Sequence, residues 1–469
     1  MTTAINLSIV SHTNIGKTTL TRTLLSRDVG EVADRAHVTV SCDPYSLAKT
    51  PEGDELILWD TPGFGNSVAL AKRLEGRSNP LGWFMSEVWD RAVNKSQWIN
   101  QQALLHVKDI SSVVLYLVNA DQLPESTPYV SAEMQILDWL GKPVIVLLNQ
   151  LGAPKSPREE NQLVARWKNA LAPFAIVRDV LAMDAFARCW VQEYALFDAV
   201  KAALPEPLKP TFEALQATWL ARRRAAYDES TAALSRFMND RVNDREIVTS
   251  VPLKARIQRL GRSLPFFKHS APSPDASIAQ QTLSKKADEA FQDLAQSLLA
   301  VNGLSGTVEP RELFSRMETV WTPRAKISGT TAGLAGAVSA GAAGGLTADL
   351  AAGGLTLGAG ALIGAIVGAI GAVGAAGIYN KQKNADGALV TWSDEALTRF
   401  LEQSILLYLA IAHFGRGRGS WEEDDAPTLW QETVAQVVKT HPEKRDFIAS
   451  AVRPLTDEVL TRLYPKVKF

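Results

Sequence analysis

A lysine and a hydroxyl residue side by side mark the most informative stretch of the sequence, Ser11-His12-Thr13-Asn14-Ile15-Gly16-Lys17-Thr18-Thr19. Backbone N–H groups of a short loop that opens a helix converge on an anion, and a lysine there adds positive charge toward phosphate groups. A threonine directly after the lysine offers a hydroxyl oxygen to Mg²⁺. We therefore predict a phosphate-binding loop in which the nucleotide-binding residues are Ser11, Thr13, Asn14, Ile15, Gly16, Lys17, Thr18 and Thr19.

The segments around this loop have the order that such a site requires. Apolar residues 5–10 predict a strand, and residues 18–25 predict a helix. Strand, loop and helix together form the context of the P-loop pattern G-x-x-x-x-G-K-[ST]. The first glycine of that pattern is replaced by Ser11, a small residue that can also occupy a turn.

A second group of residues completes the predicted phosphate site. Residues 56–60 predict a buried strand that ends in Asp60 and is followed by Thr61-Pro62-Gly63. In a switch GTPase, Asp60 would hold Mg²⁺ through water and the Gly63 N–H would sense the γ-phosphate. Thr39, in a polar loop before a short strand at residues 40–42, is predicted to complete Mg²⁺ coordination; the alternative is a β-branched residue that only favours the strand. The predicted catalytic set is Lys17, Thr39, Asp60 and Gly63.

Further apolar strands at residues 113–118 and 143–148 alternate with a helical stretch at residues 130–140. This alternation predicts an α/β domain with a mostly parallel sheet covered by helices on both faces. The second of these strands ends in Asn149-Gln150, where a base-recognition loop belongs. We predict base contacts from Asn149, Gln150 and Ala182.

In these motifs and their order, residues 1–204 resemble an Era-like GTPase of the TRAFAC class. The resemblance implies GTP and GDP as ligands and Mg²⁺ as cofactor. The remainder of the chain resembles an uncharacterised bacterial domain that accompanies such GTPase domains.

Three departures from the family bear on specificity and rate. The family reads guanine with the aspartate of Asn-Lys-x-Asp. In this sequence Gln150 stands in place of the lysine and Gly152 in place of the aspartate. Asp184 could replace that carboxylate, the loop could read guanine by its backbone, or Asp184 could only cap a helix.

Phe64 stands where a water-orienting glutamine follows Asp-x-x-Gly in the family, which predicts slow hydrolysis. Asn14 stands where potassium-stimulated members carry a K⁺ ligand; shaping the loop is the alternative.

The predicted domains are residues 1–204 with a helical insertion at about 66–110, a helical domain at 205–326, a hydrophobic hairpin at 327–379 and a helical region at 380–469. The run Arg222-Arg223-Arg224 is typical of a solvated helix face, with a lipid or phosphate site as the alternative. Residues 397–414 and 429–438 predict amphipathic helices.

Residues 327–379 carry a single charged side chain, Asp349, and are rich in glycine and alanine. Their length allows two membrane-spanning segments, and Gly360, Gly364 and Gly368 follow the spacing that lets helices approach closely in lipid. Basic residues on both sides predict that both ends stay cytoplasmic, and therefore a hairpin. A helical pair within a soluble domain and a flexible low-complexity segment are the alternatives.

Composition limits the classes of function. The 49 basic and 50 acidic side chains give no global field for nucleic acid, which is not indicated. Two cysteines favour a reducing compartment. We predict a GTP-binding regulatory switch with an unknown protein partner, located at the cytoplasmic face of the inner membrane and partly in the cytoplasm. The alternative is a soluble assembly or ribosome-associated GTPase that uses the hydrophobic tract as a protein interface.

Overall fold

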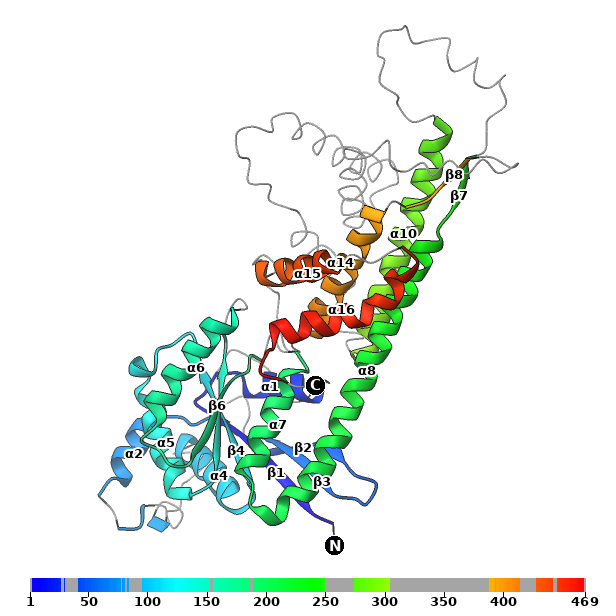
Figure 1. Ribbon diagram of the computed structural model, residues 1–469. Helices are drawn as coiled ribbons and strands as arrows, with labels where there is room; N and C mark the ends of the chain where they lie inside the picture. The colour runs from blue at the N-terminus through cyan, green and yellow to red at the C-terminus, as the bar shows by residue number, and fades with distance from the viewer. Residues whose placement is uncertain are drawn as a thin grey trace, which may run out of the picture. The chain divides into compact units, whose positions relative to one another are not determined.

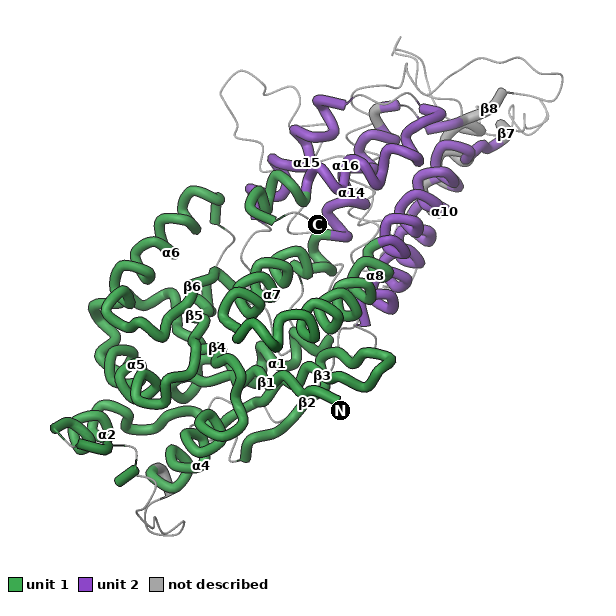
Figure 2. Tube along the Cα trace, turned by 60° about the horizontal axis from the view of Figure 1, so that its bottom comes forward, with its two compact units in different colours: residues 1–227, 409–422, 460–469 green, residues 228–408, 423–459 purple. Residues whose placement is uncertain are grey.

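The computed structural model describes residues 2–26, 29, 41–76, 78–80, 82–83, 95–151, 155–185, 189–248, 274–303, 388–392, 394–413, 427–441 and 445–467. Its contacts divide the chain into two compact units, one of residues 1–227, 409–422 and 460–469 and one of residues 228–408 and 423–459 (Figure 2). The hydrophobic tract at 327–379, Thr39 and Gly152 lie outside the described residues. The domain boundaries given above remain predictions.

Unit 1 is built on a six-stranded sheet with the strand order β2-β3-β1-β4-β5-β6 (Figure 1). Strand β1 pairs in parallel with β3 and β4, and β5 pairs in parallel with β4 and β6. The mostly parallel α/β fold predicted from the sequence is thereby confirmed. The strands are β1 Ala4–Ser11, β2 Asp43–Lys49, β3 Glu55–Asp60, β4 Val113–Asn119, β5 Val144–Asn149 and β6 Val177–Ala182.

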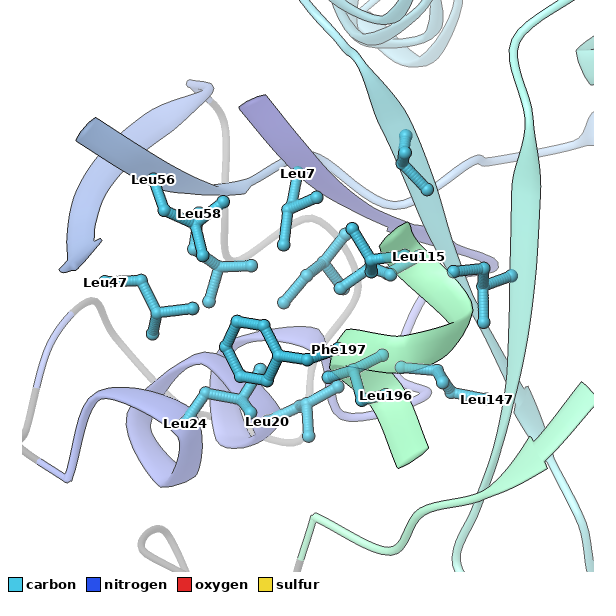
Figure 3. Close-up of a cluster of buried hydrophobic side chains, with 14 of the residues drawn as sticks. Leu7, Leu20, Leu24, Leu47, Leu56, Leu58, Leu115, Leu147, Leu196 and Phe197 are labelled. Carbon is cyan, nitrogen blue, oxygen red and sulfur yellow. The ribbon is translucent and has the colours of Figure 1, made fainter. Parts of the chain in front are cut away.

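Helices cover both faces of this sheet because the central strands are apolar on both sides. In β4, Leu115 faces one hydrophobic cluster and Tyr116 faces the other, and both are fully buried. Figure 3 shows the first cluster, where Leu20 and Leu24 of one helix and Phe197 of another meet Leu115. That face carries α1 Lys17–Leu25, α7 Gln192–Ala203 and the start of α8 Lys209–Asn243, and the opposite face carries α2 Ser67–Leu74, α4 Lys95–Asp109, α5 Pro128–Leu140 and α6 Pro157–Leu171.

The two edge strands differ from the prediction. The strand expected at residues 40–42 begins at Asp43 instead, and it pairs with β3 in the antiparallel direction. Its second residue, Pro44, lacks an N–H donor and is tolerated because an edge strand has a ladder on one side only. Strand β6, at the other edge, was not predicted because Arg178 and Asp179 interrupt its apolar pattern.

The arginine run on α8 is divided between solvent and the interior of unit 1. Arg222 and Arg224 are exposed, whereas the Arg223 side chain is 16% exposed and pairs with the fully buried carboxylate of Glu193 at 3.2 Å. Arg223 also donates to Ser26 Oγ at 2.5 Å and to the Leu24 carbonyl at 3.1 Å. Arg223 therefore binds α8 to the end of α1, and α1 is the helix that directly follows the phosphate-binding loop.

Unit 2 is mainly helical, as predicted. Phe237 packs edge-on against both Phe291 and Phe400 in its core. Among the described residues, none of the helices is both long and apolar enough to cross a bilayer. Besides the second part of α8, the unit contains β7 Glu246–Val248 paired with β8 Ala388–Val390, α10 Pro274–Val301, most of α14 Asp394–Ala412, α15 Thr428–Thr440 and most of α16 Ile448–Leu463. Short 3-10 helices lie in unit 1 at Pro124–Ser126 and Glu206–Leu208, and in unit 2 at Arg445–Phe447.

Candidate functional site

The loop between β1 and α1 has the backbone conformation of an anion-binding turn. Asn14 and Gly16 have φ angles of 62° and 93°, in the left-handed region that asparagine and glycine tolerate best. A Cβ on Gly16 would lie 2.8 Å from Asn149 Nδ2, so a larger residue does not fit there. Asn14 is exposed on this loop, while Ile15 and Thr19 are buried beneath it.

Lys17 is held inside the loop by two oxygen atoms. Its Nζ donates to Ser11 Oγ at 3.1 Å and to the His12 carbonyl at 3.3 Å, and the residue is 7% exposed. Burial lowers the pKa of Lys17 to about 8, although the charges of Asp60 and Glu133 act in the opposite direction. Ser11, where the pattern expects glycine, thus contributes a hydroxyl that contacts the lysine, a role that the motif alone did not reveal.

Asp60 and Thr18 come together at the end of β3. Thr18 Oγ1 donates to Asp60 Oδ2 at 2.6 Å, while the buried Asp60 Oδ1 has no hydrogen-bond partner within the described part of the chain. Burial raises the pKa of Asp60, against the opposing effects of the Thr18 hydrogen bond and the Lys17 charge. A hydroxyl and a carboxylate with one unsatisfied oxygen, beside the lysine of the loop, fit Mg²⁺, which prefers oxygen ligands and usually keeps water and phosphate oxygens among them.

Gly63 lies directly against the phosphate-binding loop. A Cβ on this residue would be 2.7 Å from Lys17 Nζ and 2.9 Å from Thr13 Cα. The next residue, Phe64, is fully buried, and its N–H donates to the Ser11 carbonyl at 2.9 Å. The chain after Asp60 therefore runs alongside the loop, with the glycine where only glycine fits and the phenylalanine turned into the core.

Asn149 connects the loop to the carboxyl ends of β5 and β6. Its Nδ2 donates to the Ile15 carbonyl at 2.7 Å, and its Oδ1 accepts from the Ala185 N–H at 2.7 Å. Gln150, with φ 58°, follows it, and Ala182 ends β6 in register with Leu148. The structure thus brings Asn149 beside the phosphate-binding loop, and its contact with the Ala185 N–H was not indicated by the sequence. Its predicted contact with the base stays a prediction.

Asp184 reaches the same region from the loop after β6. It is 5% exposed, and its Oδ2 accepts from the Leu151 N–H at 2.7 Å. The next helix, α7, begins at Gln192 with Val191 at its N-cap, so Asp184 does not cap it. This carboxylate supports the loop in which the family carries its base-reading aspartate.

Comparisons with protein families match two separate parts of the chain. Residues 6–150 match the family described as 50S ribosome-binding GTPase, and residues 322–459 match a domain of unknown function, DUF3482. A comparison with curated proteins gives no match.

Several solved structures are similar to part of the chain. A variant of Era from Aquifex aeolicus bound to GDP and AlF4⁻ is 19% identical, covering 44% of this chain and 58% of its own, with a TM-score of 0.33. Era in complex with MgGDPNP and a segment of 16S ribosomal RNA is 19% identical at the same coverage, with a TM-score of 0.32. NFeoB from S. thermophilus is 13% identical over 65% of this chain and 99% of its own, with a TM-score of 0.24. The chain matches 58% of the length of the Era structures.

Proposed function

We propose that this chain, whose N-terminal domain is an Era-like P-loop GTPase domain, is a regulatory switch that binds GTP and GDP and hydrolyses GTP slowly. The observation that carries the proposal is that Lys17, Thr18, Asp60 and Gly63 lie together at the carboxyl ends of β1 and β3. A buried lysine beside a buried carboxylate with one unsatisfied oxygen is a costly arrangement unless a phosphate and a cation complete it.

Each residue has a defined task in this proposal. Lys17 leaves the Ser11 hydroxyl and the His12 carbonyl to bind the β and γ phosphates, and the loop N–H groups hold the phosphate oxygens. Thr18 and Asp60 would hold Mg²⁺, and Thr39 would complete the metal site. When bound, Mg²⁺ would neutralise charge on the phosphate oxygens. Gly63 would donate its N–H to the γ-phosphate.

The base would lie against the loops after β5 and β6. Asn149 holds these loops to Ile15, and Gln150, Ala182 and the neighbouring backbone form the remaining contacts. We place Asp184 among the groups that select guanine, because its carboxylate supports the Leu151 N–H beside Gly152. With one net hydrogen bond favouring guanine, we expect a modest preference for GTP over ATP.

Slow hydrolysis follows from the position of Phe64. A buried phenyl ring cannot orient the attacking water, which the family's glutamine does. A K⁺ ion held by Asn14 would add positive charge near the transferred phosphate. Equal turnover in KCl and NaCl, with no change in Asn14→Ala, would remove the K⁺ part of the proposal.

The nucleotide site is tested by magnesium-dependent binding and turnover of GTP in the full-length protein. We expect binding in MgCl2, its loss in EDTA, and its loss in Asp60→Asn. Asp121→Asn is a matched control, since Asp121 is an exposed carboxylate just beyond the end of β4, which is separated from β3 by β1. Wild-type protein that neither binds nor hydrolyses GTP would contradict the proposed function.

We further propose that residues 327–379 engage the inner membrane from the cytoplasmic side in a nucleotide-dependent way, with part of the protein remaining in the cytoplasm. The support is the sequence alone: one charge in the tract and basic residues on both flanks. A change in nucleotide shifts such an equilibrium only if the two states contact the switch segments differently.

Membrane engagement is tested by partition between soluble and membrane fractions with GDP and with a non-hydrolysable GTP analogue. We expect the ratio to differ between nucleotides and Ile366→Arg to remain soluble, because an arginine at mid-bilayer costs about 3 kcal/mol on insertion scales. Ile366→Leu is the matched control and should behave like wild type. Identical partition of wild type and Ile366→Arg would favour the alternative, a soluble assembly GTPase that uses the tract as a protein interface.

A further inference from the structure

A buried carboxylate on α5, Glu133, joins the phosphate-binding loop to the segment that follows Asp60. Glu133 is fully buried and accepts three hydrogen bonds: from His12 Nδ1 at 2.7 Å, from Ser67 Oγ at 2.7 Å and from Tyr116 OH at 2.6 Å. A carboxylate only accepts, so His12 Nδ1 carries a hydrogen. The carboxylate is therefore satisfied entirely by groups from other elements or from the loop.

The donors lie at three different places in unit 1. His12 is in the phosphate-binding loop, Ser67 is the first residue of α2, and Tyr116 is in β4. The His12 ring also packs on Tyr129 of α5, with ring centroids 4.5 Å apart. Glu133 thus holds both the loop and the start of α2 through one side chain. Tyr116 fixes the position of Glu133 by its hydrogen bond, and Tyr129 fixes the position of the His12 ring by packing against it.

The segment between Asp60 and Ser67 is attached at several other points, and the nearest to Gly63 is the hydrogen bond from the Phe64 N–H to the Ser11 carbonyl at 2.9 Å. Thr61 Oγ1 donates to the Ile9 carbonyl at 2.6 Å near its start. In its middle, Asn100 of α4 binds both the N–H and the carbonyl of Gly65, at 3.0 and 2.7 Å. The hydrogen bond from Ser67 to Glu133 closes the segment at its far end. Gly63, which must stay against Lys17, lies between these attachments.

We propose that Glu133 is a positioning residue for GTP hydrolysis, which couples His12 in the phosphate-binding loop to Ser67 and so holds Gly63 against Lys17. The proposal rests on the proposed GTPase function. Glu133 does not contact the nucleotide. Its loss acts through the segment that follows Asp60, so it affects the geometry at the γ-phosphate more than the binding of GDP.

The first readout is hydrogen exchange of the nucleotide-free protein, which does not depend on GTP. We expect the Phe64 and Gly65 amides to exchange faster in Glu133→Leu and in Ser67→Ala than in wild type. Ser111→Ala is the matched control, because Ser111 is a buried serine on the same face of the sheet whose Oγ lies 2.5 Å from Ser8 Oγ rather than near the loop. Equal exchange in wild type and Ser67→Ala, or equal acceleration in Ser111→Ala, would overturn the coupling.

The second readout separates turnover from binding. Glu133→Leu is expected to lower kcat by about tenfold or more, as the loss of hydrogen bonds to a charged group implies, with GDP affinity within about threefold of wild type. Glu133→Gln keeps an acceptor oxygen and should recover part of kcat. Adding Ser67→Ala to Glu133→Leu should cause no further loss, because the link is already broken.

The outcomes distinguish this inference from the proposed function. Additive losses in the double variant, or an unchanged kcat in Glu133→Leu, would overturn the positioning role while leaving a functional GTPase. If Glu133→Leu does not fold, Ser67→Ala decides by itself, because it removes only the donor of the hydrogen bond to Glu133: Phe64 and Gly65 amides that exchange as in wild type would overturn the role. A wild-type protein without GTP binding would end the proposed function, while hydrogen exchange would still decide whether Glu133 couples the two segments.

Discussion

The two ends of the candidate nucleotide site are held together by different kinds of contact. At the phosphate end, most of these contacts join side chains: Thr18 donates to Asp60 at 2.6 Å and Lys17 to Ser11 at 3.1 Å, although Lys17 also donates to the His12 carbonyl at 3.3 Å. At the base end, side chains contact the backbone: Asn149 binds the Ile15 carbonyl and the Ala185 N–H, and Asp184 binds the Leu151 N–H.

This difference explains why the two ends differ in how closely they keep the family pattern. Phosphate and Mg²⁺ require particular side chains, so a substitution of Lys17 or Asp60 removes the chemistry itself. A backbone N–H is supplied by any residue except proline, so a base-reading loop can change its side chains if its conformation is kept. The phosphate end is therefore expected to be intolerant, and the base end tolerant, of substitution.

The largest effect is expected from Lys17→Ala at the phosphate end. Removing the charge-assisted hydrogen bonds to two phosphates should weaken GTP and GDP binding by about a hundredfold or more. Fluorescence titration with a labelled guanine nucleotide measures the affinity. Lys49→Ala, which removes an exposed lysine from β2, should leave it unchanged. Retained affinity in Lys17→Ala would place the phosphates elsewhere.

Asn149→Ala tests the side chain that links the two ends. It leaves the Ile15 carbonyl and the Ala185 N–H without their partner, so we expect a fall of about 2 kcal/mol in the free energy of unfolding and roughly tenfold weaker nucleotide binding. Denaturant titration and nucleotide titration measure the two quantities. Asn119→Ala is the control, because Asn119 ends the neighbouring strand β4 and its side-chain Oδ1 accepts from the Asp121 N–H at 2.9 Å in an exposed turn. Unchanged stability in Asn149→Ala would show that the link is dispensable.

The same difference accounts for what the sequence predicted. Lys17, Thr18 and Asp60 lie close together because β1 and β3 are parallel neighbours, so the loop after β1 meets the end of β3. Their roles in nucleotide binding stay predictions. The contacts of Ala185, Glu133 and Arg223 were not predicted. They depend on which helix faces which loop, and a single glutamate or a backbone N–H has no motif around it.

The sequence pattern also did not predict the two edge strands of the sheet correctly. Strand β2 carries Pro44, and β6 carries Arg178 and Asp179, so neither has the apolar run of a central strand. Their pairing with β3 and β5 decides the assignment. The core strands were predicted because burial on both faces demands apolar residues throughout.

Asp184→Asn tests the base end alone. The amide keeps an acceptor oxygen for the Leu151 N–H but loses the negative charge, so the fold should be retained. We expect the preference for GTP over ATP to fall below about threefold while total affinity for triphosphates changes little. Asp179→Asn, which breaks only the ion pair with Lys168, is the control. An unchanged preference would assign guanine selection to the backbone.

The smallest effect is the pH dependence of nucleotide binding. Because the pKa of Lys17 is about 8 rather than 10.5, about nine tenths of the lysine is charged at pH 7 and about a quarter at pH 8.5, so we expect affinity to fall about fourfold between these two pH values. As the pH rises from 8 to 10.5, the contribution of Lys17 to the free energy of unfolding increases, since the unfolded chain binds more protons than the folded chain in that range. Affinity that is flat with pH would show that Lys17 remains fully charged before nucleotide binds.

Competition titration of a labelled guanine nucleotide with GTP and with ATP, in MgCl2 and wild-type protein, tests the central claim most directly. We expect both to compete, because Lys17, Thr18 and Asp60 would serve any nucleoside triphosphate, and we expect GTP to compete better by about tenfold, which corresponds to about 1.4 kcal/mol or one net hydrogen bond. ATP that matches or outcompetes GTP would contradict the assignment of this chain as a GTPase, although its phosphate site would remain.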